Sequence, residues 1–436
     1  MTDNTWVRVR FQDLIDEGVL EIGDGHRAKL SELTGGGPIF LRAVHLTESR
    51  IDLEGVERFS PELAGHLKAK MAKAGDTIVT TKGNSTGRTG FVADGMPEFV
   101  YSPHLSFWRS RDPGRLAAGF LRYWARSPEF RDQLTGMKHS TDMAPYLSLR
   151  DQRRLLVSLP PPLEQHAIAS ILGALDAKLD LNGSTNRTIE AILRAVFKSW
   201  FVDFDPVLAK AVGREPVGLD PQGAAEFPTN FSEAAPDTIP DGWRLAPIYD
   251  VADVVYGAPF ASHHFNAERR GLPLLRIRDL VNQNPEVFTD EVHPKGKTVK
   301  QGDIVVGMDG EFRAVIWHGP ESWLNQRVCQ FTPKGSAGTS YIYHSIIEPL
   351  AEFERTKVGT TVTHLGKADI DTFRVVHPGD RILARFTALT QPLIDRTLAN
   401  AAESRLVSQL RDYLLPRLLS GEVRVDQARS LVEQVV

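Results

Sequence analysis

"PPPLEQHAIASILGALDAKLDLN", residues 160–182, begins a long run in which seam positions recur at alternating steps of four and three residues. The steps average 3.5 residues, which is the repeat of a coiled coil. The seam consists of Ile168, Leu172, Leu175, Leu179, Asn182, Asn186, Ile189, Leu193, Val196 and Trp200. At 1.5 Å per residue, a helix over 164–200 would extend roughly 55 Å, so it has few places to lie on one domain. The alternative is an ordinary amphipathic helix packed on its own domain.

A second seam lies 218 residues further along the chain. It consists of Phe386, Thr390, Leu393, Thr397, Asn400, Ser404, Val407, Arg411, Leu414 and Leu418. Both seams carry an asparagine at the same middle position, Asn182 and Asn400. If the helices pack antiparallel about a pseudo-twofold axis, these amides meet and pair. Such a buried polar pair costs stability but fixes the register, because a slip leaves each amide unsatisfied.

The two seams belong to a longer internal repeat. The matched residues are Trp6 with Trp243, Leu41 with Leu275, Gly75 with Gly302, and Pro160 with Pro378. Their separations fall steadily along the chain, from 237 through 234 and 227 to 218 residues, as small deletions in the second copy would produce. Each copy is therefore predicted to be a globular half followed by a long helix.

The repeat predicts an α+β fold. Short β-rich runs such as "DTIVTT" (76–81) and "DIVVGM" (303–308) are broken by glycine-rich turns, which suits a twisted sheet in each globular half. The expected segments are a first globular domain (1–160), a spacer helix (161–205), a proline-rich extended linker (206–240), a second globular domain (241–380), a second spacer helix (381–420) and a tail (421–436).

"FKSWFVDFDP", residues 197–206, combines aromatic residues with two aspartates at the end of the first seam. We expect the phenylalanines to widen the apolar face of the helix. Asp203 and Asp205 come after the last seam position, and Pro206 forbids further helix. We therefore interpret the aspartates as marking the end of the helix, not as a catalytic acid pair.

The composition of the 436 residues, with 42% hydrophobic and 24% charged, is that of an ordinary globular protein. No run approaches 18 apolar residues and the start lacks a secretory pattern, so we expect a cytoplasmic protein. Cys329 is the only cysteine, which excludes an internal disulfide and clustered-cysteine zinc sites. The net charge of −4 gives no support to nucleic-acid binding, which would have to use local basic surface or be shared with a more basic partner.

Four stretches in this order resemble the specificity subunits of type I restriction–modification systems. They are residues 160–182, "AVFKSWFVDFDPV" (195–207), "IPDGWRLAPI" (239–248) and "LRDYLLPRLLSGEVRV" (410–425). The resemblance implies two α/β target-recognition domains, each reading one half of a bipartite site in double-stranded DNA, separated by an antiparallel coiled coil. It further implies two modification (methyltransferase) subunits that bind S-adenosylmethionine and dock on this scaffold, with motor–nuclease restriction subunits as further partners. The second copy departs from the pattern, with "HPGDRILARF" (377–386) in place of Pro-Pro-x-x-Glu-Gln, so the resemblance implies less about docking there.

Motifs for chemistry are scarce. The chain has neither the Asp/Asn-Pro-Pro-aromatic stretch of an amino-methyltransferase nor a phosphate-binding P-loop. Asp176-Ala-Lys178 has the acid-x-lysine spacing of a metal nuclease, but beside Leu175 and Leu179 we expect surface charge flanking the seam. His263 and His264 are adjacent and are expected in a loop. We therefore predict no catalytic residue, no metal and no cofactor of its own.

Two polar loop regions in each copy have the composition of DNA-reading surfaces. The candidates in the first copy are Lys82, Asn84, Ser85, Thr86, Arg88, Lys138, His139, Ser140 and Thr141. The candidates in the second copy are Arg313, in 307–315, and Lys357, Thr360, Thr361 and Thr363, in 357–364. Asp309 and Glu311 would repel phosphate but could accept from a cytosine amino group. The alternative is that these are plain polar turns.

A helix of roughly 55 Å matches about one and a half turns of B-DNA, which favours two half-sites at fixed spacing. The loops of the two copies differ, so the half-sites are expected to be unrelated in sequence. Two other functions stay open: a duplicated coiled-coil adaptor without sequence-specific DNA binding, and a metal-dependent nuclease.

Overall fold

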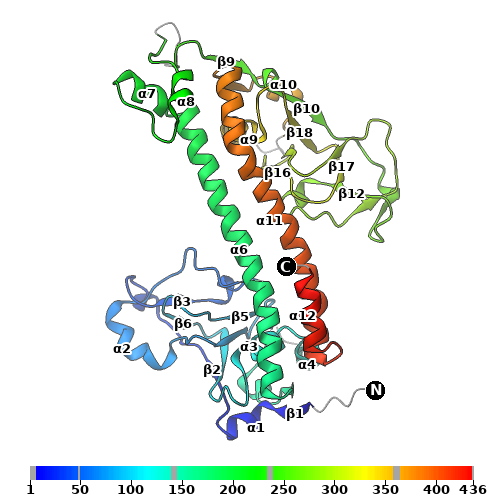
Figure 1. Ribbon diagram of the computed structural model, residues 1–436. Helices are drawn as coiled ribbons and strands as arrows, with labels where there is room; N and C mark the ends of the chain where they lie inside the picture. Colours follow the sequence, from blue (N-terminus) through cyan, green and yellow to red (C-terminus); the bar gives the residue numbers. More distant parts are fainter. Residues whose placement is uncertain (1–5, 48–49, 139–144, 233–238, 357–363, 435–436) are drawn as a thin grey trace. The chain divides into compact units, whose positions relative to one another are not determined.

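The computed structural model describes residues 6–47, 50–138, 145–232, 239–356 and 364–434 (Figure 1). The chain forms two compact units: unit 1 comprises Met1–Leu179 and Arg405–Val436, and unit 2 comprises Asp180–Ser404. Two long helices, α6 (Pro162–Phe201) and α11 (Asp380–Ser420), each contribute one part to either unit. Each unit therefore contains a globular domain and a segment of both helices.

Unit 1 contains short strands and helices in addition to α6 and α11. These are β1 (Val7–Arg10), α1 (Phe11–Asp16), β2 (Leu20–Asp24), β3 (Ile39–Leu41), α2 (Ala64–Leu67), β4 (Thr77–Thr80), β5 (Thr89–Phe91), β6 (Phe99–Tyr101), β7 (Leu105–Ser110), α3 (Ala118–Trp124), α4 (Pro128–Lys138), α5 (Leu149–Gln152), β8 (Leu156–Leu159) and α12 (Val425–Glu433). The central sheet has the order β2-β7-β4-β5, and β3-β6 and β1-β8 form two further pairs.

Unit 2 repeats this arrangement with additions. Its elements are α7 (Asp205–Ala211), α8 (Pro221–Glu226), β9 (Arg244–Pro247), β10 (Ala252–Tyr256), β11 (Phe265–Asn266), β12 (Leu272–Leu275), β13 (Phe288–Thr289), β14 (Thr298–Val299), β15 (Ile304–Gly307), β16 (Ala314–Ile316), β17 (Ser322–Leu324), β18 (Val328–Pro333), α9 (Thr339–Thr356), α10 (Lys367–Ile370) and β19 (Arg374–His377). The sheet β10-β18-β15-β16 corresponds to the central sheet of unit 1, the parallel pair β12-β17 to β3-β6, and β9-β19 to β1-β8.

The turns that precede β4 and β15 show how closely the copies agree. The backbone N–H of Lys73 donates to Asp76 Oδ2 at 2.9 Å, and that of Lys300 donates to Asp303 Oδ2 at 2.6 Å. Between them, Gly75 and Gly302 have φ values of 89° and 90°, which glycine adopts without steric cost. The internal repeat and the α+β fold predicted from the sequence are thereby confirmed.

The two turns differ in what surrounds the aspartate. Asp76 is fully buried and receives a forked pair of hydrogen bonds from Arg109, with Nε–Oδ1 and Nη2–Oδ2 distances of 2.6 Å. Tyr101 donates a further bond at 2.7 Å. At the equivalent position burial raises the pKa of Asp303, against hydrogen bonds from the backbone of Lys300 and the side chain of Gln330. The same turn thus encloses a paired carboxylate in unit 1 and a poorly compensated one in unit 2.

The helices α6 and α11 run antiparallel and lie side by side within each unit (Figure 1). In unit 2, Asn182 contacts Ser404 and Asn186 contacts Thr397, so residue numbers rise along one helix as they fall along the other. Seam residues also join the domain cores: Leu172 and Leu418 belong to the same apolar cluster as Trp108 in unit 1. The predicted antiparallel pairing is confirmed, and the helices pack on their domains as well as on each other.

The aromatic residues at the end of α6 lie in the core of unit 2. Phe201 packs against Phe386 of α11 with ring centroids 4.9 Å apart, and Trp200 packs against Phe227 at 5.1 Å. The helix ends at Phe201; Phe204 has a left-handed φ of 56°, and α7 then begins at Asp205 with Pro206 in its first turn. Aromatic burial, not acid chemistry, accounts for this stretch.

The proline-rich segment 206–240, for which composition predicts an extended linker, carries the two short helices α7 and α8. It buries Val207 and Phe227 in the core of unit 2, and Asp220 caps α8 by accepting from the backbone N–H of Gly223 at 2.6 Å. Its few apolar residues follow no period, but they reach the aromatic cluster around Trp200, which holds the segment against the domain.

Candidate nucleic-acid interface

The first predicted loop region of unit 1 lies between β4 and β5. Thr86 is buried, and its hydroxyl lies 2.6 Å from the carbonyl oxygen of Gly83 and 3.0 Å from that of Pro145. Arg88 donates from Nη1 to the carbonyl oxygen of Leu46 at 2.7 Å. These two side chains therefore shape the loop. Lys82 and Asn84 are exposed, and Ser85 is half-buried.

The second predicted region of unit 1 follows α4. Lys138 is the last residue of that helix, and His139, Ser140 and Thr141 lie outside the described residues. Where the description resumes, the backbone N–H of Gly83 donates to Pro145 at 3.1 Å, and Lys82 and Tyr146 form an isolated antiparallel bridge. The structure thus brings the first loop region against the segment that follows the second.

We call this meeting of two loop segments beside the end of a central strand the junction, and unit 2 has an equivalent one. Arg313 is paired with Glu311 at 2.6 Å, and Lys357, Thr360, Thr361 and Thr363 lie outside the described residues. The description resumes at His364, which forms an isolated antiparallel bridge with Asp309. In both units, then, two regions far apart in sequence meet beside the end of β4 or β15.

Residues absent from the predicted set also lie at this junction. Tyr146 is 57% exposed, and the side chain of Arg327 is 52% exposed. Asp309 Oδ2 lies 3.0 Å from Arg327 Nη1, and its Oδ1 lies 2.6 Å from His364 Nδ1. The Asp309 carboxylate, which could have accepted from a cytosine amino group, is therefore paired with two side chains of its own unit. The internal repeat is the sequence signal that could have located Arg327 and His364. Aligning the two copies places each of them opposite a residue of the first copy.

The seam asparagines are buried, with exposed fractions of 3% for Asn182 and 2% for Asn400. Their side-chain amides do not pair with each other, but Asn182 Nδ2 donates to the backbone carbonyl oxygen of Asn400 at 3.4 Å. Asn182 Nδ2 donates to Glu403 Oε2 at 2.8 Å and to Ser404 Oγ at 3.2 Å, while Asn400 Nδ2 donates to Asn186 Oδ1 at 2.8 Å. Each amide thus reaches the opposite helix through a different polar neighbour, which makes a polar layer of Asn182, Asn186, Asn400, Glu403 and Ser404.

This layer yields a test of register. Asn400→Leu alone should lower the free energy of unfolding by about 1 kcal/mol, because it leaves the half-buried Oδ1 of Asn186 without its donor. Replacing Asn182, Asn186 and Asn400 together with leucine should instead raise stability and loosen the register. Denaturant unfolding measures the first effect, and spin labels at Thr188 and Arg396, both exposed, measure the second. A triple variant with neither added stability nor a broadened label distance would contradict this role.

Asp176 is buried in unit 1, so the expectation of surface charge at this position is wrong. Its carboxylate lies 2.6 Å from Arg122, 3.4 Å from Arg126 and 3.2 Å from Arg411, and Tyr123 donates to it at 2.9 Å. Burial lowers the pKa of Arg126. The aspartate therefore joins α3, α6 and α11 through three cations.

The described parts of the chain contain no assembled metal site of the kind that a metal-dependent nuclease would need. No group of three or more His, Cys, Asp or Glu side chains there is placed to hold a metal ion. The adjacent His263 and His264 lie in a single turn before β11, with His264 Nδ1 2.8 Å from Asp290 Oδ1. No helix in the described ranges is long and apolar enough to cross a membrane.

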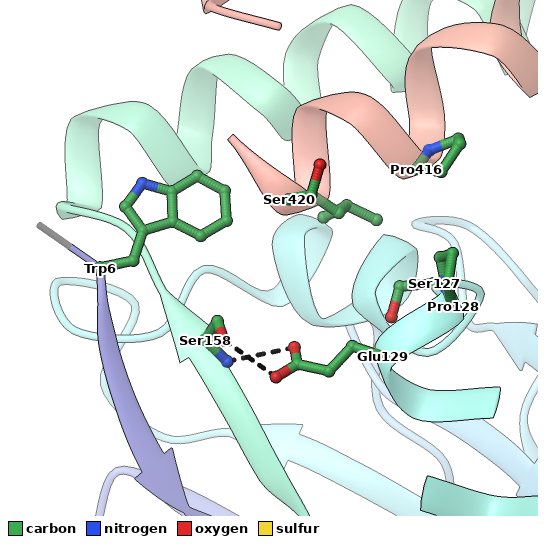
Figure 2. A pocket seen from close by; sticks show the side chains of 8 residues that line it. Trp6, Ser127, Pro128, Glu129, Ser158, Pro416 and Ser420 are labelled. Atoms are coloured by element: carbon green, nitrogen blue, oxygen red, sulfur yellow. Dashed lines mark hydrogen bonds between the residues drawn. The ribbon is translucent and has the colours of Figure 1, made fainter. Parts of the chain in front are cut away.

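Unit 1 has a pocket of about 340 Å³ beside the end of α11 (Figure 2). Its lining consists of Trp6, Ser127, Pro128, Glu129, Ser158, Pro416, Leu419 and Ser420. Glu129 accepts from Ser158 Oγ at 2.8 Å and from Trp124 Nε1 at 2.7 Å. Glu129 is the one titratable side chain of the lining, and its bond to Ser158 joins α4 to β8.

The comparisons with known proteins agree with this architecture. Residues 240–397 match the family model described as type I restriction modification DNA specificity domain. The chain is 25% identical to the type I restriction enzyme HindI specificity subunit of Haemophilus influenzae, over 83% of this chain and 89% of that protein. It is 28% identical to the EcoBI specificity subunit of Escherichia coli, over 45% of this chain and 37% of that one.

A solved structure adds evidence on the fold. The type I restriction–modification S subunit of M. genitalium superposes with a TM-score of 0.60 at 14% identity, covering 96% of this chain and 97% of that one. The repeat, the paired helices and the sequence matches lead to one conclusion. Over most of its length the chain is similar to the specificity subunits of type I restriction–modification systems, and residues 240–397 match the DNA specificity domain.

Proposed function

We propose that each globular domain reads one half of a bipartite site in double-stranded DNA, and that α6 and α11 set the spacing of the two half-sites. The observation that carries this proposal is the repeated junction. One backbone frame occurs twice, with the bridge between Lys82 and Tyr146 in unit 1 and between Asp309 and His364 in unit 2. Two equivalent frames with different exposed side chains suit two readers of unrelated half-sites.

The partners in this proposal are two methyltransferase subunits that bind S-adenosylmethionine, with motor–nuclease subunits as an addition. Methyl transfer and cleavage are assigned to them, and this chain contributes targeting. The bonding of Asp176 and Glu129 supports that division, because both carboxylates are used to join elements of unit 1. The cytoplasm is the compartment in which such a complex would meet DNA.

The proposal is tested by gel shift with the chain alone and with its methyltransferase subunits. The duplexes are a random sequence and the motif found by mapping methylated bases in a host that carries the complex. We expect binding to the motif to exceed binding to the random duplex by at least about 10³-fold, which is the low end for specific recognition. Equal affinity for both duplexes would support the adaptor function instead.

A further inference from the structure

The junction in each unit contains a third segment, the turn before β7 or β18. The backbone N–H of Thr81 donates to His104 at 2.8 Å, and that of Met308 donates to Arg327 at 2.9 Å. On the other side, Leu147 donates to Thr81 and Leu365 donates to Met308, both at 2.8 Å. Three segments are thus joined by the same backbone bonds in both units.

Strand register shows that the positions are equivalent. Thr77 pairs with Trp108 across β4 and β7, and Ile304 pairs with Phe331 across β15 and β18. Counting from these pairs, the residues that meet at each junction correspond one to one. The unit 1 triplet is Lys82, His104 and Tyr146, and the unit 2 triplet is Asp309, Arg327 and His364.

The frame is alike in the two units, while the triplets differ at every position. Leu147 and Leu365 are identical and buried, and Asp76 and Asp303 make the same turn. Lys82, His104 and Tyr146 are exposed, and so are Arg327 and His364. The two domains share one backbone arrangement but carry different exposed side chains on it. These side chains can therefore give the two domains different DNA sequence preferences.

The unit 2 triplet has the chemistry of a guanine reader. Asp309 is only 22% exposed, and it pairs with Nη1 of Arg327 and with Nδ1 of His364. The rest of the guanidinium, on a side chain that is 52% exposed, remains available to solvent. An arginine that is held by Nη1 can still present its Nε–Nη2 edge to the O6 and N7 acceptors of guanine in the major groove. The adjacent carboxylate stays compatible with DNA because its charge is offset by the cation that it orients.

We infer that these triplets determine the base sequence of the two half-sites, with Arg327 donating to a guanine and Asp309 acting as its positioning residue. This rests on the proposed function, because it assigns the contacts of the same interface. Lys82, His104 and Tyr146 occupy the same frame without a carboxylate, so they read a different base pair in the other half-site.

The experiment uses the complete complex, co-expressed with its methyltransferase subunits, and maps methylated bases across the host genome. In the Arg327→Ala complex, one guanine of one half-site should no longer be required, so that other bases are accepted at that position of the methylated motif. Binding to the original target, measured by gel shift, should weaken by about 5- to 150-fold. Asp309→Asn should loosen the same position to a smaller extent. Lys82→Ala combined with His104→Ala should loosen the other half-site alone. Arg244→Ala is the matched control, because it is 56% exposed and pairs with Asp250 at 2.8 Å.

The outcomes separate this inference from the function on which it rests. An unchanged motif in Arg327→Ala overturns the inference, and so does a loss of base preference in both half-sites. Equal weakening of binding to every sequence also overturns it, because that result indicates a phosphate contact. If Arg327→Ala fails to assemble, Asp309→Asn and the Lys82/His104 variant decide by the same criterion. A wild-type complex that methylates no bipartite motif would instead overturn the proposed function.

Discussion

Asp76→Asn should lower the free energy of unfolding of unit 1 by about 3 kcal/mol or more, whereas Asp303→Asn should leave unit 2 equally or more stable. The first substitution removes the charge that pairs with Arg109, whose side chain is only 9% exposed. Breaking one partner of a buried ion pair costs about 3–5 kcal/mol because the other charge stays buried. Glu21, 3.6 Å from Arg109, offsets part of that cost. Hydrogen exchange, read separately for peptides of each unit, measures the difference.

The pH dependence of the free energy of unfolding provides a control for the Asp76→Asn and Asp303→Asn variants. Burial raises the pKa of Asp303, so the folded unit binds that proton more tightly than the unfolded chain does. Below the usual aspartate pKa of 3.8 the carboxyl is neutral in both states, and Asp303→Asn should match the wild type. As the pH rises through the raised pKa, the charged form is disfavoured by burial and the advantage of the asparagine should appear. An equal loss of stability in both variants at neutral pH would contradict this account.

Asp176→Asn should destabilise unit 1 by about 3 kcal/mol, because it leaves Arg122, Arg126 and Arg411 close together without their central anion. Their side chains are only 20–23% exposed, so solvent screens their repulsion weakly. The expected result is an earlier unfolding transition, with increased hydrogen exchange in α3 and in the part of α11 that belongs to unit 1.

Asp412→Asn provides the matched comparison for this second prediction. Asp412 also pairs with Arg411, at 2.9 Å, but its side chain is 65% exposed. Removing it should change the free energy of unfolding by no more than about 0.5 kcal/mol. If the two substitutions have equal effects, then burial of Asp176 is not what makes its ion pairs important.

Periodicity and repetition predicted the architecture well, because both depend on residues close in sequence or on one part of the chain matching another. The seam found both helices, and the matches around Leu41, Gly75 and Pro160 found equivalent strands and turns. Composition was weaker for segment 206–240. Its buried residues, Val207 and Phe227, are too widely spaced to show a period.

The roles of individual polar residues were harder to predict, because they depend on partners distant in sequence. Arg88 resembles a DNA contact by type, but its guanidinium is bound by the carbonyl of Leu46. Asp176 looks like a surface charge on its own helix, and only folding brings Arg411 to it. The set Lys138–Thr141 and the set Lys357–Thr363 stay predictions, as they fall almost wholly outside the described residues.

The division of the chain between the two units has a consequence for synthesis on the ribosome. Unit 2 is one continuous stretch, Asp180–Ser404, whereas the core of unit 1 includes Val407, Leu414 and Leu418. Domains generally fold as they emerge, the N-terminal one first. Here that order is reversed: the domain translated first must wait for the C-terminal part of α11, and the apolar surface that these residues cover stays exposed while unit 2 forms. The globular domain of unit 1 is therefore the part of the nascent protein most in need of protection by a chaperone.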